Sequence, residues 1–162
     1  MRALWITGIA LVLDQLSKWW VMASMDLYES VPVIGSFFKL TYIHNPGAVF
    51  GLRLGGAYFH LGLAVVALVF VFVLLWRLPA DARWPSVGLA LVLGGAIGNM
   101  IDRVRFGVVI DFLDFGFGDT RWWVFNLADS WVSVGTVLLL FTYGLQSSGE
   151  ADSDAVQNST RP

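Results

Sequence analysis

The sequence predicts an all-α membrane protein with four transmembrane helices and a small extracytoplasmic β-rich cradle. The first observation is composition: the 162 residues are 57% hydrophobic and only 14% charged, whereas an ordinary soluble domain carries roughly 25% charged residues. The second is that four stretches approach the length of about 20 apolar residues that crosses the hydrocarbon core. The third is that residues 25–57 are rich in β-branched and aromatic residues. Soluble and disordered classes are therefore excluded, and a net charge of −2 does not suggest nucleic-acid binding.

The four spans are expected at about residues 3–23, 58–76, 85–101 and 125–145, within one domain covering 1–145. The second is the clearest, because no charged residue occurs from Leu61 to Trp76. The first could be a cleavable signal peptide, but its apolar run continues past Asp14 and Lys18 without a clear small-residue cleavage site. We therefore expect a retained helix there. Indole rings favour the headgroup region, and seven of the eight tryptophans lie at or near these span ends: Trp5, Trp19, Trp20, Trp76, Trp84, Trp122 and Trp123.

The short loop between the second and third spans favours one orientation. It carries Arg77 and Arg83, and short basic loops tend to be cytoplasmic. Both termini are then cytoplasmic, and segments 25–57 and 102–124 are extracytoplasmic. Residues 146–162, rich in Ser, Gly, Glu, Asp and Asn, are predicted to be a disordered cytoplasmic tail.

Polar residues inside or beside the spans are functional candidates, because they are costly in a membrane. Asp14 and Lys18 are four residues apart and can form an ion pair on one helix face; a structural role is the favoured interpretation. Gly94 and Gly98 permit close helix packing. The third span then ends in side chains that can form a hydrogen-bonded network: Asn99, Asp102 and Arg103.

Asp129 differs from these groups, because no basic residue occurs anywhere in 122–145 to neutralise it locally. A carboxyl group partly removed from water keeps its proton to higher pH, so Asp129 is a candidate proton carrier. The alternative is that it only caps the start of a helix. With the predicted orientation, Asp129 and most other polar groups gather toward the outer leaflet. That favours an active site at the membrane surface over a transporter site near the midplane.

The residue types favour two aspartates sharing one proton, which together can hydrolyse a peptide. The chain has no Cys and only two His, so neither a metal nor a cofactor is expected. The partner of Asp129 would come from Asp102, Asp111, Asp114 or Asp119. Asp111 is somewhat favoured because it lies in an apolar run that is expected to be extended and to lie against protein or lipid, whereas Asp114 and Asp119 lie near Gly and are expected to be solvated. The residues alone leave the choice open.

Five blocks occur in order: Asp14–Lys18, Asn45–Phe50, Gly94–Arg103, Val109–Phe112 and Phe125–Asp129. With these blocks the sequence resembles the bacterial lipoprotein signal peptidases (signal peptidase II), membrane aspartic peptidases with four transmembrane helices. The resemblance covers roughly residues 4–145. Pro46 and Val49 depart from the family's usual Asn-x-Gly-Ala-Ala-Phe block, which affects details of substrate contact.

The resemblance implies that Asp111 and Asp129 are the catalytic pair. It implies that the remaining matched positions support the site or contact substrate: Asp14, Lys18, Asn45, Gly47, Asn99, Asp102, Arg103, Asn126 and Ala128. The implied substrate is a diacylglyceryl-modified prolipoprotein, cleaved just before the lipidated Cys. Membrane lipids and the cyclic peptide globomycin, an inhibitor, are further implied partners, and the bacterial cytoplasmic membrane is the implied location.

The outer segment 25–57 is expected to form a short hairpin or small sheet at the membrane surface, and the alternative is a loop that only covers the site. Val31–Gly35 and Phe37–Ile43 have the composition of strands, and Asn45–Gly47 that of a turn. The family has a small β-rich cradle here. Two other function classes remain: a proton-coupled transporter or channel subunit using Asp14 and Asp129 as relay groups, and a non-catalytic scaffold that binds helices through Gly94 and Gly98.

Overall fold

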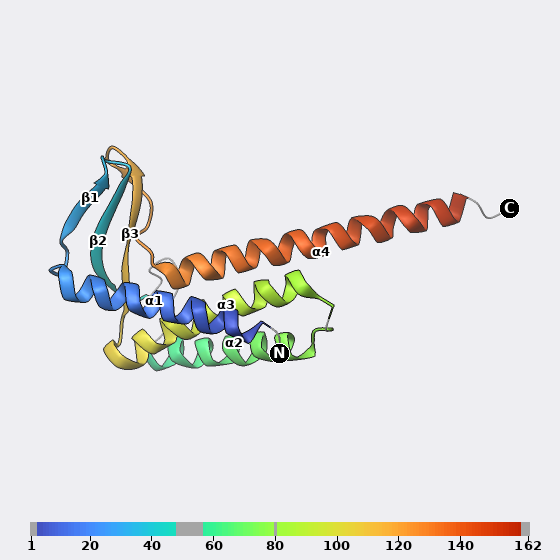
Figure 1. Cartoon of the computed structure of the whole chain (residues 1–162), viewed down its shortest axis with the longest axis horizontal. Helices are drawn as coiled ribbons and strands as arrows, with labels where there is room; N and C mark the ends of the chain where they lie inside the picture. The colour runs from blue at the N-terminus through green and yellow to red at the C-terminus, as the bar shows by residue number, and fades with distance from the viewer. Residues whose placement is uncertain (1–2, 48–56, 80, 160–162) are drawn as a thin grey trace.

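The computed structural model describes residues 3–47, 57–79 and 81–159. A helical bundle carries a β-sheet at one end (Figure 1). The helices are α1 (Leu4–Ser24), α2 (Ala57–Arg77), α3 (Arg83–Phe106) and α4 (Leu127–Ser159). The strands are β1 (Ser30–Ile34), β2 (Phe38–Asn45), β3 (Val109–Phe117) and β4 (Thr120–Arg121). Each predicted span overlaps one of these helices.

The predicted all-α fold is wrong, because the chain also contains a four-stranded antiparallel sheet in the order β1-β2-β3-β4. The hairpin of β1 and β2 is where the sequence predicts strands, and the turn after it is closed by the Gly47 N–H, which donates to Asn45 Oδ1 at 2.9 Å. Strand β3 begins in the apolar run around Asp111 that the sequence predicts to be extended, but its pairing partner is not predicted. It pairs with β2, placing Ile43 opposite Asp111, and this pairing of distant segments leaves no local sequence pattern.

The prediction of four membrane-spanning helices is also wrong when the helices are judged by their length and mean hydropathy. Among the described residues, one helix, Arg83–Phe106, is long and apolar enough to cross a membrane. Helices α2 and α4 contain shorter apolar stretches, Gly62–Arg77 and Leu127–Tyr143. Helix α1 carries Asp14 and Lys18 in its middle, both buried.

Helix α3 packs against each of the other three helices, and glycines allow the close approach. A Cβ on Gly94 would lie 2.9 Å from the Ala10 Cβ of α1. A Cβ on Gly95 would collide with the Ala128 carbonyl oxygen of α4, and one on Gly98 would collide with Asp14 Oδ2. The close packing predicted at Gly94 and Gly98 is confirmed.

A small core joins the sheet to α1. Val21 of α1 packs with Tyr42 of β2 and with Ile110 and Phe112 of β3, all buried. Because side chains alternate along a strand, Asp111, between Ile110 and Phe112, points to the other face. Anchoring β3 through its apolar residues therefore fixes the direction of the carboxyl group.

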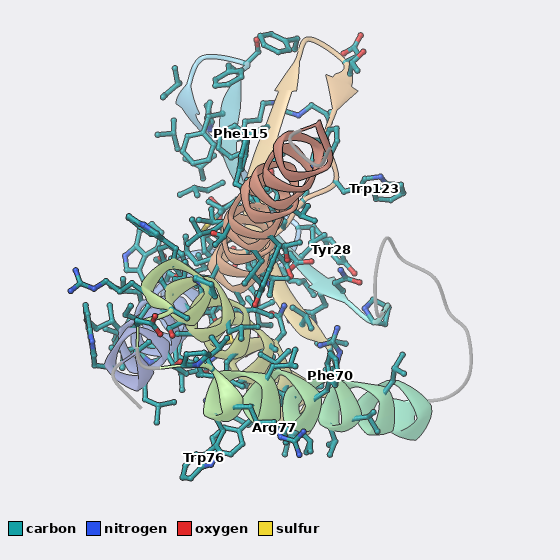
Figure 2. The ribbon with its side chains drawn as sticks, turned by 90° about the vertical axis from the view of Figure 1, so that its right-hand side faces the viewer. Tyr28, Phe70, Trp76, Arg77, Phe115 and Trp123 are labelled. Atoms are coloured by element: carbon teal, nitrogen blue, oxygen red, sulfur yellow. The ribbon has the colours of Figure 1, made fainter. Side chains whose placement is uncertain are left out.

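Aromatic side chains project outward along the bundle. The seven tryptophans predicted at span ends are all exposed, from 51% for Trp20 to 68% for Trp122. Figure 2 shows Trp76 on the outer side of α2 and Trp123 directed away from the ribbon. Such a distribution fits a protein whose surface meets lipid headgroups.

The segment predicted to be a disordered tail is largely helical in the structure. Helix α4 continues to Ser159 and extends past the rest of the bundle (Figure 1). Adding residues to an existing helix costs far less than starting one, so a polar composition does not by itself end it. Residues 160–162 lie outside the described residues, as do Ala48, Val49 and Phe50 of the matched block.

Candidate active site

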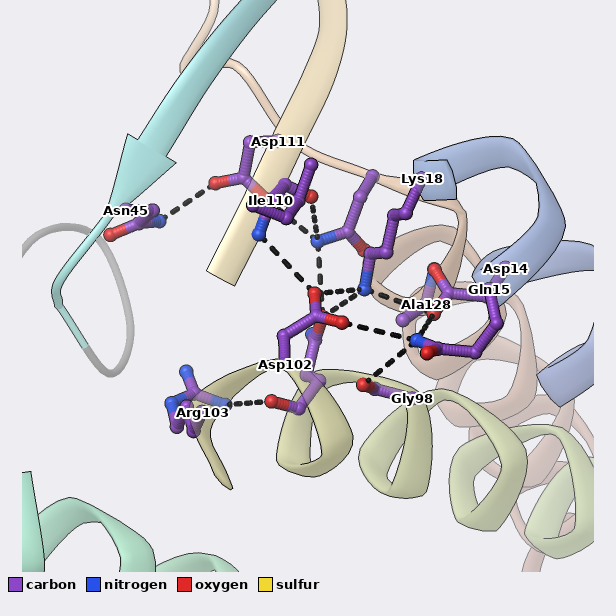
Figure 3. A network of polar contacts seen from close by, with 12 residues as sticks. Asp14, Gln15, Lys18, Asn45, Gly98, Asp102, Arg103, Ile110, Asp111 and Ala128 are labelled. Atoms are coloured by element: carbon purple, nitrogen blue, oxygen red, sulfur yellow. Dashed lines mark hydrogen bonds and ion pairs between the residues drawn. The ribbon is translucent and has the colours of Figure 1, made fainter. Parts of the chain in front are cut away.

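Asp111 is held at the buried start of β3, with 1% of its surface exposed. Each of its carboxyl oxygens accepts a hydrogen bond from an asparagine. Asn45 Nδ2 donates to Oδ2 at 2.8 Å, and Asn126 Nδ2 donates to Oδ1 at 2.6 Å. The contact with Asn45 appears in Figure 3, where strand β3 brings Asp111 above the end of α3.

The surroundings of Asp111 favour its protonated form. Burial, and next the negative charge of Asp129, raise the pKa of Asp111 from 3.8 to about 7. The hydrogen bonds from Asn45 and Asn126 and the charge of Lys18 oppose that rise. Asp111 can therefore hold or release a proton near neutral pH.

Asp129 lies in the first turn of α4, half-buried. Its backbone N–H donates to Asn126 Oδ1 at 2.9 Å, and the Asn126 N–H donates to Asp129 Oδ2 at 3.4 Å. This reciprocal pair is a variant of the capping box that starts many helices. Asp129 Oδ1 accepts from Asn99 Nδ2 at 2.7 Å. Asp129 thus does help to start α4, and its second oxygen faces the polar end of α3.

Two asparagines connect the predicted catalytic carboxyl groups. Asn126 donates to Asp111 and accepts from Asp129. Asn99 donates to Asp129, and its Oδ1 accepts from Asn126 Nδ2 at 3.0 Å. The structure therefore brings Asp111 and Asp129 together around one pair of side-chain amides, although they come from a strand and a helix.

A buried ion cluster lies directly beneath this pair. Lys18 Nζ is 2.9 Å from Asp14 Oδ2 and 2.8 Å from Asp102 Oδ2, and all three side chains are at most 1% exposed. The predicted ion pair of Asp14 and Lys18 is confirmed, and Asp102 completes it. Gln15, which is not among the residues predicted for the site, donates to Asp14 Oδ2 at 3.2 Å and to Asp102 Oδ1 at 3.1 Å. Its position between Asp14 and Lys18 in a polar run was the available signal.

The ion cluster also fixes the elements that carry the two aspartates. Asp14 Oδ1 accepts from the Ala128 N–H at 2.8 Å, one of the backbone donors left free at a helix start. Asp102 Oδ2 accepts from the Ile110 N–H at 3.2 Å. Each contact lies one residue from a predicted catalytic aspartate, so the cluster aligns α4 and β3 relative to α3 (Figure 3).

Arg103 of α3 contacts Gly47, which follows β2. Arg103 donates to the Gly47 carbonyl oxygen and to the Asn99 carbonyl oxygen, both at 3.3 Å. Its charge interacts with Asp129 and Asp111 as well as with Asp102. All eleven residues selected from the sequence thus lie in one connected region.

The other two acidic candidates lie elsewhere. Asp119 is exposed in the turn between β3 and β4. Asp114 was expected to be solvated, which is wrong: it is 7% exposed and pairs with Arg121 NH2 at 2.8 Å. Thr41 also donates to it at 2.7 Å. Arg121 lies on β4 and Thr41 on β2, the two strands that pair with β3. This cluster therefore forms only when the sheet assembles, and it could not be predicted from the sequence. Within the described residues, no group of three or more His, Cys, Asp or Glu side chains could hold a metal ion.

Comparison with known proteins gives consistent matches over most of the chain. A family described as "Signal peptidase (SPase) II" matches residues 6–145. The lipoprotein signal peptidase of Psychromonas ingrahamii is 44% identical over 146 residues, covering 87% of this chain and 83% of that protein. That of Moorella thermoacetica is 45% identical over 139 residues, covering 86% and 90%.

Solved structures match the fold as well. A bacterial membrane enzyme determined by the in meso method at 2.3 Å resolution aligns with a TM-score of 0.81 and 27% identity, covering 91% of this chain and 90% of that one. A second, at 1.9 Å resolution, aligns with a TM-score of 0.74 and 28% identity, covering 88% and 92%.

Proposed function

The chain belongs to the signal peptidase II family, and from this premise we propose that Asp111 and Asp129 carry out its peptide hydrolysis. The family's members are aspartic peptidases that process lipoproteins, and this chain is an enzyme of that type. The transporter or channel considered from the sequence is not supported by these relatives.

One observation carries the assignment. Asp111 of β3 and Asp129 of α4 meet at Asn126, which donates to the first at 2.6 Å and accepts from the backbone of the second at 2.9 Å. The negative charge of Asp129 disfavours ionisation of Asp111. Two carboxyl groups that cannot both ionise cheaply hold one proton between them, which is the state needed to activate water.

The surroundings assign different starting roles to the two groups. Asp111 is almost fully buried and holds the proton, because its pKa is raised to about 7. Asp129 is half-buried at the positive end of the α4 dipole, and its Oδ1 accepts a hydrogen bond from Asn99, an arrangement that suits the base of the pair. Asp129 therefore acts first as general base and Asp111 as general acid.

In the first step, Asp129 takes a proton from water while the water oxygen adds to the scissile carbonyl carbon. Asp111 gives its proton to the carbonyl oxygen, and a neutral gem-diol forms. In the second step the C–N bond breaks. Asp129 gives its proton to the leaving amine, and Asp111 recovers one from the diol. No covalent enzyme intermediate is required, and both side chains return to their starting states.

The other selected residues support this pair in three ways. Asn45, Asn99 and Asn126 donate to its carboxyl oxygens. Arg103 adds positive charge beside both aspartates and contacts Gly47. The remaining residues align β3 and α4 through the buried ion cluster and its backbone contacts: Asp14, Lys18, Asp102 and Ala128.

The substrate we propose is a prolipoprotein carrying diacylglyceryl, cleaved before the lipidated Cys. The sheet beside the site exposes apolar side chains such as Val33 and Ile34, and each CH₂ buried against such a surface contributes about 0.8 kcal/mol. Globomycin and membrane lipids are proposed as further ligands of the same region.

The enzyme is membrane-bound, as its family is. We propose the bacterial cytoplasmic membrane, a single membrane domain over residues 1–145, and cytoplasmic termini. The dyad and the sheet then lie at the extracytoplasmic side, where the exposed Trp19, Trp20, Trp122 and Trp123 would sit among headgroups.

The direct test is incubation of the purified protein with a diacylglyceryl-modified prolipoprotein, with and without globomycin. The expected products are the free signal peptide and a lipoprotein that begins with the lipidated Cys, and globomycin should suppress both. The same prolipoprotein without its lipid is the matched substrate control. Absence of cleavage by the folded protein, or cleavage elsewhere, would contradict the proposal.

A further inference from the structure

We propose that Lys18 is a positioning residue that acts through Asn99. It turns the Asn99 side-chain nitrogen toward Asp129 and so keeps the charge of the catalytic pair on Asp129. This inference rests on the function proposed above for Asp111 and Asp129. It gives the buried ion cluster a role in catalysis besides its role in holding the helices together.

All three hydrogens of the Lys18 ammonium group are used in hydrogen bonds or ion pairs. An ammonium group has three N–H donors and cannot accept. Lys18 Nζ has three acceptors in contact: Asp102 Oδ2 at 2.8 Å, Asp14 Oδ2 at 2.9 Å and Asn99 Oδ1 at 2.9 Å. Because Lys18 is 1% exposed, no water can easily replace one of these partners.

The orientation of Asn99 depends on the groups that face its side chain. The two ends of a side-chain amide are chemically distinct, one accepting and the other donating. A nitrogen turned toward Lys18 would face a donor-only cation, so the oxygen must occupy that side. The nitrogen is then directed at Asp129 Oδ1, at 2.7 Å. Asn126 Nδ2 donates to the same Asn99 oxygen at 3.0 Å, so Lys18 acts with Asn126 in directing the Asn99 nitrogen to Asp129, and of these two donors Lys18 is the charged one.

The other asparagine is oriented independently. Asn126 Oδ1 accepts the backbone N–H of Asp129 at 2.9 Å, so its nitrogen faces Asp111 without help from Lys18. Each carboxyl group of the pair thus receives a hydrogen bond from a different side-chain amide, Asp111 from Asn126 and Asp129 from Asn99. Only the amide serving Asp129 depends on a side chain of α1, and removing that side chain should affect the two aspartates unequally.

The charged groups that face the pair are few. Asp129, Lys18 and Arg103 act on Asp111, and Arg103 also acts on Asp129. Lys18 is itself faced by Asp14 and Asp102. Loss of the Asn99 donor leaves ionised Asp129 with weaker support, so the acidic limb of the pH profile of kcat/KM should move to higher pH. A residue that only stabilises the fold would not move that limb.

The test is a double-mutant cycle in the full-length protein with lipidated prolipoprotein as substrate. Lys18→Met alone would leave two buried anions without their cation, so it is combined with Asp102→Asn. The formal charge of the cluster stays at −1: Lys18, Asp14 and Asp102 sum to −1 in the parent, and Asp14 is the one charged group left in the variant. This pair of changes is made with Asn99 intact and in an Asn99→Ala background. Lys39→Met, a lysine on β2 outside the site, is the matched control.

With Asn99 intact, the charge-balanced variant should lose about 100-fold in kcat with KM unchanged, and its acidic limb should move to higher pH. In the Asn99→Ala background the same changes should cause no further loss. Asn99→Asp provides a second test that leaves Lys18 in place: it keeps an oxygen toward Lys18 but presents an acceptor to Asp129. It should fold, lose kcat to a similar extent and shift the same limb.

Equal losses in both backgrounds, or a parental pH profile in Asn99→Asp, would overturn the inference. If the charge-balanced variant does not fold, Asn99→Asp decides alone. Failure of the dyad itself is recognised separately, because Asp111→Asn and Asp129→Asn would then retain turnover whatever the Lys18 variants do.

Discussion

Asn126 holds Asp111 through a 2.6 Å hydrogen bond from its Nδ2, while its Oδ1 caps the backbone of the helix that carries Asp129. One side chain thus serves as helix cap and as ligand of a buried acid. The side chain that starts α4 is therefore the one that brings the proposed catalytic pair together.

Replacing either dyad residue should abolish cleavage. Asp111→Asn and Asp129→Asn remove the group that carries the proton, and general acid–base catalysis typically contributes about 10²–10⁴-fold per group. We expect no detectable product in detergent from lipidated prolipoprotein, while circular dichroism retains the parental helix content. Full turnover by either variant would mean that the pair is wrongly assigned.

The remaining acidic residues of β3 and its turn should be dispensable for chemistry. Asp114→Asn weakens the contact with Arg121 and should lower the free energy of unfolding by about 1–3 kcal/mol, yet leave kcat largely intact. Asp119→Asn, at an exposed turn, should change neither the free energy of unfolding nor kcat. Thermal melting and cleavage assays on the same preparations separate the two effects. A loss in Asp114→Asn as deep as that in Asp111→Asn would favour Asp114 as the second catalytic residue.

Activity should fall as pH rises through about 7. Asp111 must be protonated to act as general acid, and burial together with Asp129 raises its pKa to about 7. The protonated fraction is therefore high below that pH and is lost above it. The measurement is kcat/KM against pH, with a lipidated substrate that has no titrating group near the cleavage site. A profile that stays flat through neutral pH into the alkaline range would argue against Asp111 as the acid.

Close packing at Gly98 should be essential. A Cβ there would collide with Asp14 Oδ2, which is fixed by Lys18, so Gly98→Ala should destabilise the protein by about 1–3 kcal/mol and reduce activity. Gly8→Ala is the matched control, because nothing lies within 4 Å of its would-be Cβ and alanine favours a helix. Melting temperatures of the two variants should differ in opposite directions from the parent; a neutral Gly98→Ala would contradict the packing argument.

Local patterns predicted much of this molecule well. The apolar runs located four helices, and β-branched residues located the β1–β2 hairpin, because both signals lie within one segment. The i,i+4 spacing predicted the pair of Asp14 and Lys18, whose charged atoms lie 2.9 Å apart in the structure. For β3 the patterns predicted an extended apolar run but not its pairing, because the partner strand lies far away in the sequence. They also overestimated the number of helices that are long and apolar enough to span a membrane.

The membrane character, the helix positions and the set of acidic candidates can be read from the amino-acid sequence, since they follow from composition and short-range periodicity. Folding is needed to show that Asp114 pairs with Arg121, that Asp102 joins Lys18, and that Asn99 presents its nitrogen to Asp129. The physical reason is that burial and hydrogen-bond direction depend on segments brought together by folding. A carboxyl group has the same chemistry wherever it occurs; its neighbours decide whether it forms an ion pair or carries a proton.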